Sequence, residues 1–215
     1  MNKTDTTGTP AGQLSYLALG DSYTIGEAVP VIQNFPSQLT ARLNTAGFKV
    51  AAPKIIARTG WTTGELKSAI QAENLTGKYD IVTLLIGVNN QYRGYPVTDF
   101  RTEFKELLQT AIQFASGNIK HVFVVSIPDW GATPFGKESG RNQQLIAMDI
   151  DAFNAVCKEE SANAGVNYTD ITPGSKNAAT DAELVTSDGL HPSAKMYTNW
   201  VNQLSPEVVK ALALR

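Results

Sequence analysis

The stretch YLALGDSYTIGEAV, residues 16–29, changes abruptly from apolar to polar sequence. Tyr16–Leu19 is a short apolar run, and Gly20, Asp21 and Ser22 follow it directly. An apolar run of this length that stops at turn-forming residues is typical of a buried β-strand that ends in a sharp turn. The sequence therefore predicts a core strand that presents polar side chains at its carboxyl end.

Apolar runs and helical patterns alternate along the rest of the chain. Strands are expected at residues 14–20, 49–57, 79–87, 119–127 and 166–171. Helices are expected at residues 35–47, 62–73, 98–116, 141–165 and from about Ser193 to Leu214, with a break before Pro206. Because the strands are apolar on both faces, this order predicts a doubly wound α/β domain with a parallel sheet covered on both sides.

Length and composition favour one globular domain over residues 14–215. Of the 215 residues, 42% are hydrophobic and 18% are charged, which excludes a disordered chain. Residues 1–13 are polar and turn-prone, and we interpret them as a disordered tail or tether. A net charge of −2 offers no basic stripe for nucleic acid, and no apolar run approaches the roughly 20 residues of a membrane span.

Cysteine content and short motifs bear on disulfides, the compartment and cofactors. The single cysteine, Cys157, excludes an internal disulfide. It leaves the compartment open between the cytoplasm and, if a leader was trimmed, the periplasm or the exterior. The oligomeric state is not indicated. No metal-binding motif occurs, and GATPFGK at 131–137 lacks the Ser or Thr that completes a phosphate-binding loop. We therefore expect neither a metal nor another cofactor.

Polar residues follow the predicted strands at one edge of the sheet, where ligand sites form in such folds. Ser22 follows the first strand, Gly60 the second and Asn89 the third, while Asp188 and His191 precede the last helix. These are the parts needed for acyl transfer. A serine hydroxyl needs a base, and imidazole suits that role near pH 7 because its unperturbed pKa is about 6.5. The N–H groups of Ser22 and Gly60 and the amide of Asn89 could bind the oxyanion.

Two aspartates compete as the acid that orients the imidazole. We favour Asp188, because three residues bring it and His191 into one loop, but Asp170 near the end of the fifth strand remains an alternative. The other histidine, His121, lies early in the fourth strand and thus at the wrong edge of the sheet.

Further residues at the same edge are expected to contact substrate. Aromatic and arginine side chains are typical of binding sites, although Asp21 is expected mainly to shape its turn. The predicted contacts are Asp21, Trp61, Asn90, Tyr92, Arg93 and Trp130.

Four sequence blocks resemble those of the GDSL, or SGNH, hydrolases: GDSY at 20–23, Gly60, GVNN at 87–90 and DGLHP at 188–192. The resemblance implies a flavodoxin-like α/β/α fold with a five-stranded parallel sheet, and a serine esterase or acylhydrolase that acts on small-molecule esters without a cofactor. It also implies Ser22, Asp188 and His191 as the triad, and Ser22, Gly60 and Asn89 as oxyanion donors. Tyr23 and Asn90 depart from the family's usual leucine and aspartate.

Three alternatives to an esterase remain open from the sequence. The same triad could hydrolyse an acyl thioester, the domain could be a non-catalytic ligand-binding module, or it could be a nucleotide-binding switch. The chain has little sequence beyond its core elements, and this favours a short-chain or acetyl ester in an open cleft.

Overall fold

The computed structural model describes residues 12–214, in which five parallel strands form a single sheet. The strand order is β2-β1-β3-β4-β5, so the chain winds outward from β1 in both directions. This confirms the doubly wound parallel sheet. The strands are β1 (Tyr16–Gly20), β2 (Lys54–Ala57), β3 (Ile81–Leu85), β4 (Val122–Val125) and β5 (Asn167–Thr169).

The central strands are apolar on both faces because helices cover both faces of the sheet. All residues of β1, β3 and β4 are buried. Leu19 of β1 lies in register with Ile56 of β2 on one side and with Leu84 of β3 on the other. The Tyr16 hydroxyl and the Thr83 hydroxyl share a buried hydrogen bond of 3.0 Å between β1 and β3.

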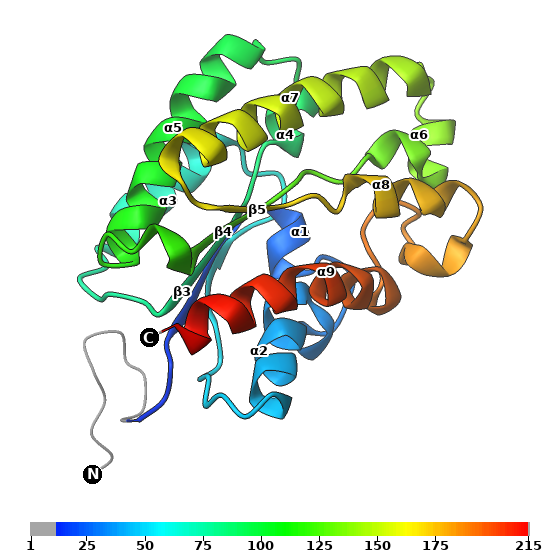
Figure 1. Ribbon diagram of the computed structural model, residues 1–215. Coiled ribbons are helices and arrows are strands. Elements are labelled where there is room, and N and C mark those ends of the chain that lie inside the picture. Colours follow the sequence, from blue (N-terminus) through cyan, green and yellow to red (C-terminus); the bar gives the residue numbers. More distant parts are fainter. Residues whose placement is uncertain (1–11, 215) are drawn as a thin grey trace.

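Five long helices form the two outer layers of the domain. In Figure 1, α3, α5 and α7 lie on one side of the sheet, and α2 and α9 pack together on the other. On α5, Phe100, Phe104 and Leu107 form the buried stripe at helical spacing. Tyr197 and Trp200 of α9 pack against Phe35 of α2. The long helices are α2 (Phe35–Thr45), α3 (Thr63–Glu73), α5 (Val97–Phe114), α7 (Gln143–Ala164) and α9 (Ala194–Ala213).

Short helices occupy the loops that follow the strands. The α-helices are α1 (Ser22–Ile25), α4 (Val88–Tyr92), α6 (Pro134–Glu138) and α8 (Thr172–Ser175). The 3-10 helices are η1 (Val31–Gln33), η2 (Ile119–His121), η3 (Trp130–Ala132), η4 (Lys176–Ala179) and η5 (Ala182–Leu184). Since α1, α4, η3 and α8 each follow a strand, they gather at the carboxyl edge of the sheet.

Most predicted boundaries differ from the observed ones by up to three residues, and two predictions are further from the structure. The second strand begins at Lys54 instead of residue 49, because Val50 pairs with Leu14 only as an isolated bridge and Pro53, which has no backbone N–H, directly precedes the strand. The last helix does not break before Pro206. It continues because Leu204 and Val208, on either side of the proline, are both buried, and their packing offsets one lost backbone hydrogen bond.

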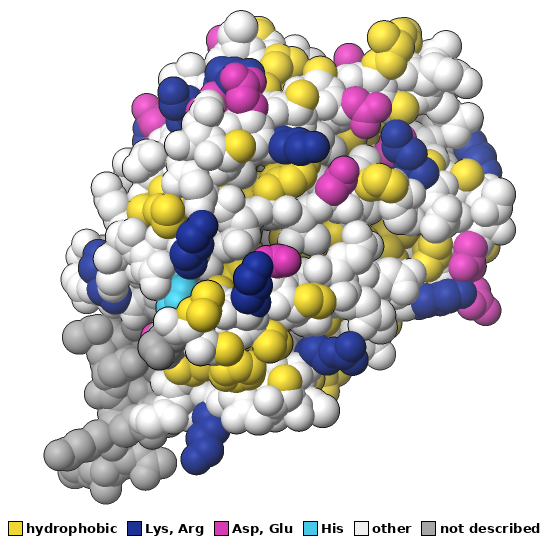
Figure 2. Space-filling view, viewed as in Figure 1, with side chains coloured by type: hydrophobic (Ala, Val, Ile, Leu, Met, Phe, Trp, Pro, Cys, Tyr) yellow, Lys and Arg dark blue, Asp and Glu magenta, His cyan; other side chains and the backbone are white. Residues whose placement is uncertain are grey.

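The predicted tail, residues 1–13, lies outside the described residues except for its last two. Within residues 12–214, no helix combines the length and apolarity that crossing a membrane requires. On the face shown in Figure 2, basic and acidic side chains are interspersed.

Candidate active site

Ser22 is the first residue of α1 and lies directly beyond the end of β1. Gly20 is the last residue of β1. Only glycine fits there, because a Cβ at this position would collide with the carbonyl oxygen of Leu85 and the side chain of Thr24. Asp21 then caps α1 by accepting a 3.0 Å hydrogen bond from the N–H of Tyr23. Ser22 is only 5% exposed, and its exposed part lines a cavity.

The Asp21 carboxyl group is completely buried, and burial raises its pKa to about 7. Hydrogen bonding to the N–H of Tyr23 opposes this shift without cancelling it. The structure corrects the predicted substrate contact of Asp21, because a side chain without exposed surface cannot meet a ligand. Its expected role in the turn agrees with the observed cap.

His191 and Asp188 form a close pair in the loop before α9. The distance from His191 Nδ1 to Asp188 Oδ2 is 2.6 Å. Asp188 Oδ1 also accepts from the N–H groups of Leu190 and His191, at 2.8 and 2.9 Å, and from the Thr186 hydroxyl at 2.7 Å. Partial burial would raise the pKa of Asp188, but these hydrogen bonds outweigh it and hold the pKa well below its usual range.

The pairing with Asp188 determines which ring nitrogen of His191 can accept a proton. With Nδ1 directed at a carboxylate, Nδ1 carries the proton and Nε2 is the basic nitrogen. The ring of Tyr23 packs edge-on against the imidazole, with 6.0 Å between centroids, and helps to fix its plane. No direct hydrogen bond joins Ser22 and His191 among the described residues, but both side chains line the same cavity.

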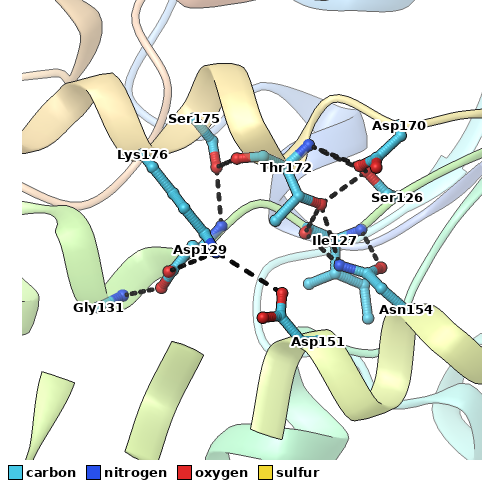
Figure 3. A network of polar contacts seen from close by, with 10 residues as sticks. All are labelled: Ser126, Ile127, Asp129, Gly131, Asp151, Asn154, Asp170, Thr172, Ser175 and Lys176. Carbon is cyan, nitrogen blue, oxygen red and sulfur yellow. Dashed lines mark hydrogen bonds and ion pairs between the residues drawn. The ribbon is translucent and has the colours of Figure 1, made fainter. Parts of the chain in front are cut away.

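Asp170, the alternative acid, lies elsewhere. Its Oδ1 accepts from the Ser126 hydroxyl and the Thr172 N–H, both at 3.2 Å (Figure 3). It lines a different depression, together with Lys158 and Tyr168. The structure therefore brings His191 together with Asp188 and not with Asp170.

Gly60 and Asn89 also reach the cavity that contains Ser22 and His191. Gly60 has a φ of 86°, which favours glycine, and its carbonyl accepts a 2.6 Å hydrogen bond from Arg93 Nη2. Asn89 Nδ2 donates to the carbonyl of Trp61 at 2.9 Å. Because an amide nitrogen carries two protons, this bond orients the group and leaves the second N–H for a ligand.

Asn90, next to Asn89, has a different position. It is fully buried, accepts from the Thr63 N–H at 3.0 Å and donates to the Thr63 hydroxyl at 2.6 Å. It thereby ties α4 to the start of α3. Its predicted contact with substrate is corrected, because no part of the side chain is exposed.

The cavity has a volume of about 180 Å³ and a mainly apolar wall. Of the predicted substrate contacts, Tyr92 and Trp130 line it, whereas Trp61 and Arg93 do not and instead form hydrogen bonds with Asn89 and Gly60. Tyr23, Thr59, Val88 and Leu190 were not predicted. All four lie in or next to the sequence blocks that supplied Ser22, Gly60, Asn89 and His191, and that position is the signal that could have identified them.

A family model agrees with this site. The model of the GDSL-like lipase/acylhydrolase family matches residues 18–198, a range that includes every residue of the candidate site. The chain belongs to this family. It is therefore a carboxylic ester hydrolase, and a catalytic triad with an oxyanion hole is typical of such enzymes. No curated protein sequence matches the chain significantly.

Solved structures share the fold of this GDSL hydrolase. TesA superposes with a TM-score of 0.71 at 17% identity, over 92% of this chain and 99% of TesA. The lipase/acylhydrolase from Enterococcus faecalis gives 0.71 at 21% identity, over 91% and 95% of the two chains. The acetylxylan esterase Axe2 from Geobacillus stearothermophilus gives 0.69 at 14% identity, over 91% and 94%. These likenesses confirm the three-layer α/β/α fold.

Trp130, which forms one wall of the hydrolase's cavity, is held by a polar network. Its Nε1 donates to Gln91 Oε1 at 2.8 Å. The preceding residue, Asp129, caps η3 by accepting from the Gly131 N–H, and its own N–H donates to the Ser175 hydroxyl. Lys176 extends toward Asp129, with 3.9 Å between Nζ and the carboxylate (Figure 3). Burial raises the pKa of Asp129, against the attraction of Lys176.

Proposed function

We propose that the enzyme hydrolyses carboxylic esters of short acyl groups through an acyl-enzyme on Ser22. One observation carries the proposal: His191, paired with Asp188 at 2.6 Å, lines the same small cavity as Ser22. A hydroxyl and an imidazole in one cavity, with a carboxylate on the far ring nitrogen, are the groups that activate a serine.

In the proposed acylation, Ser22 Oγ attacks the ester carbonyl carbon and its proton moves to His191 Nε2. The bond to the leaving oxygen then breaks, and His191 returns the proton to the departing alcohol. Water attacks the acyl-enzyme, His191 accepts a proton from it, and the acid product leaves as Ser22 regains its hydrogen. Asp188 stays ionised throughout and stabilises the imidazolium.

In this mechanism, three hydrogen-bond donors stabilise the negative charge that develops on the carbonyl oxygen. They are the N–H groups of Ser22 and Gly60 and the second amide N–H of Asn89. Two observations support this role. Ser22, Gly60 and Asn89 line one cavity, and hydrogen bonds to Trp61 and Arg93 hold Asn89 and Gly60 in place. Donors that are fixed before reaction need no reorganisation in the transition state, and each contributes about 10²–10³ in rate.

The cavity's size supports a short acyl group. Its volume of about 180 Å³ is well below the roughly 300–1,000 Å³ of sites for drug-sized ligands. Trp130 packs against Phe135, with 6.0 Å between ring centroids, and both rings limit the space beyond Ser22. An acetyl or similarly short acyl group fits this shape.

The first test is hydrolysis of p-nitrophenyl acetate by the wild type and by Ser22→Ala. Removal of the nucleophile is expected to lower kcat/KM by at least about 10³-fold. A fluorophosphonate probe is expected to label the wild type and not the variant. If Ser22→Ala retains its rate and the wild type resists labelling, the serine mechanism is wrong.

A further inference from the structure

A second groove lies next to the cavity and shares Tyr92 with it. It has a volume of about 520 Å³ and includes Arg141, Leu145 and Asp149 in its lining. Because Tyr92 lines both spaces, the groove borders the cavity at this residue. A leaving group larger than the cavity would have the groove as the neighbouring space.

Arg141 is fixed at the junction of the two spaces. Its guanidinium carbon lies 4.2 Å from the ring centroid of Tyr92 and 5.7 Å from that of Trp130. Nη1 donates to the carbonyl oxygen of Tyr92 at 3.0 Å. Both rings line the cavity, so the contacts that hold the guanidinium also hold the cavity wall.

The charge of Arg141 is not neutralised by a neighbouring carboxylate. Within residues 12–214, none lies within the 4.0 Å of an ion pair, whereas Arg93 nearby lies 3.3 Å from Glu65. Asp149 also lines the groove, but its carboxylate accepts from Gln91 Nε2 at 3.3 Å. One of the five guanidinium N–H donors is used on Tyr92, and the others are available to a ligand.

We propose that this groove binds the leaving group of the ester and that Arg141 selects leaving groups that carry a carboxylate. The inference rests on the proposed function, with the short acyl group in the smaller cavity. A planar guanidinium can bind a carboxylate through two parallel N–H bonds, and stacking on Tyr92 orders it beforehand. An aromatic leaving group would also lie beside the ring of Tyr92.

The test compares two substrates, 4-acetoxybenzoate and its neutral methyl ester, with purified full-length enzyme. Arg141→Gln is expected to lower kcat/KM for the carboxylate about tenfold more than for the methyl ester. Arg141→Lys keeps the charge but not the paired donors, so its loss is expected to be smaller. Arg42→Gln removes an equal charge from α2, on the opposite side of the sheet, and is expected to change neither rate.

The outcomes separate this inference from the hydrolase mechanism. High salt is expected to reduce the preference for the carboxylate in the wild type and not in Arg141→Gln. Equal losses for both substrates in Arg141→Gln would show that Arg141 only supports Tyr92, and no loss would show that the groove is not a subsite. Either result overturns the inference, while the Ser22→Ala comparison on the methyl ester tests the mechanism independently.

Discussion

The serine side and the histidine side of the cavity are held in place by different means. On the serine side, Asp21 is completely buried and fixes Ser22 through one cap on α1. On the histidine side, the Asp188 side chain is 37% exposed and collects four hydrogen bonds within its own loop. The core determines the position of the nucleophile, whereas a local polar network determines that of the base.

The two carboxylates consequently respond to their surroundings in opposite directions. Burial raises the pKa of Asp21 to about 7, while hydrogen bonds that outweigh partial burial lower the pKa of Asp188. Only a carboxylate that remains ionised can stabilise an imidazolium, so Asp188 suits the acid's role and Asp21 suits a structural one. Environment, and not residue type, separates the two aspartates.

The largest expected effect comes from Asp188→Asn. An asparagine of the same size loses the charge and no longer holds the imidazole in the required tautomer. We expect kcat to fall about 10³–10⁴-fold on p-nitrophenyl acetate, with little change in KM.

Asp170→Asn is the matched control for this prediction. The substitution is chemically identical, but Asp170 contacts Ser126 and Thr172 instead of His191. We expect kcat to stay within about twofold of the wild type, because surface substitutions usually have small effects. A large loss in Asp170→Asn with a small loss in Asp188→Asn would reverse the assignment of the acid.

The sequence predicted the sheet well because strand and helix patterns alternate clearly. All five strands and all five long helices occur, and the errors lie at their ends. The start of the second strand was placed too early, because the apolar pattern does not show that the pairing with the first strand is interrupted between Val50 and Lys54. The predicted helix break before Pro206 is wrong, because the low helix propensity of proline does not take into account the packing of Leu204 and Val208.

Site residues were predicted where chemistry restricts the residue type. Ser22, His191 and Asn89 follow from the groups that acyl transfer needs. Neighbouring positions were harder to assign, because a one-residue shift on a short helix changes a side chain from exposed to buried. Asn89 faces the cavity and Asn90 the core, although both follow the same strand. Arg141 was missed because its place beside Tyr92 depends on the fold.

A smaller effect is expected on stability from Asp21→Asn. The pKa of Asp21 is raised in the folded state, so the folded protein holds this proton more tightly than the unfolded chain. The free energy of unfolding should therefore fall as pH rises from about 4 to about 7, by up to a few kcal/mol from this group. Asparagine cannot ionise. The free energy of unfolding of the Asp21→Asn variant, measured with urea, should therefore change less between about pH 4 and about pH 7 than that of the wild type. Parallel profiles for the two proteins would contradict the raised pKa.

The smallest effect is expected from Thr186→Val, which removes one of the four bonds to Asp188. The Thr186 hydroxyl donates to Asp188 Oδ1 at 2.7 Å, and valine keeps the shape of the side chain and the backbone bond to His191. Loss of one such bond costs about 1 kcal/mol, so kcat should fall about fivefold. Thr110→Val, on the exposed side of α5, makes the same chemical change and should leave kcat unaltered. A loss in Thr186→Val as large as that in Asp188→Asn would mean that the loop acts as one cooperative unit, whose bonds cannot be removed singly.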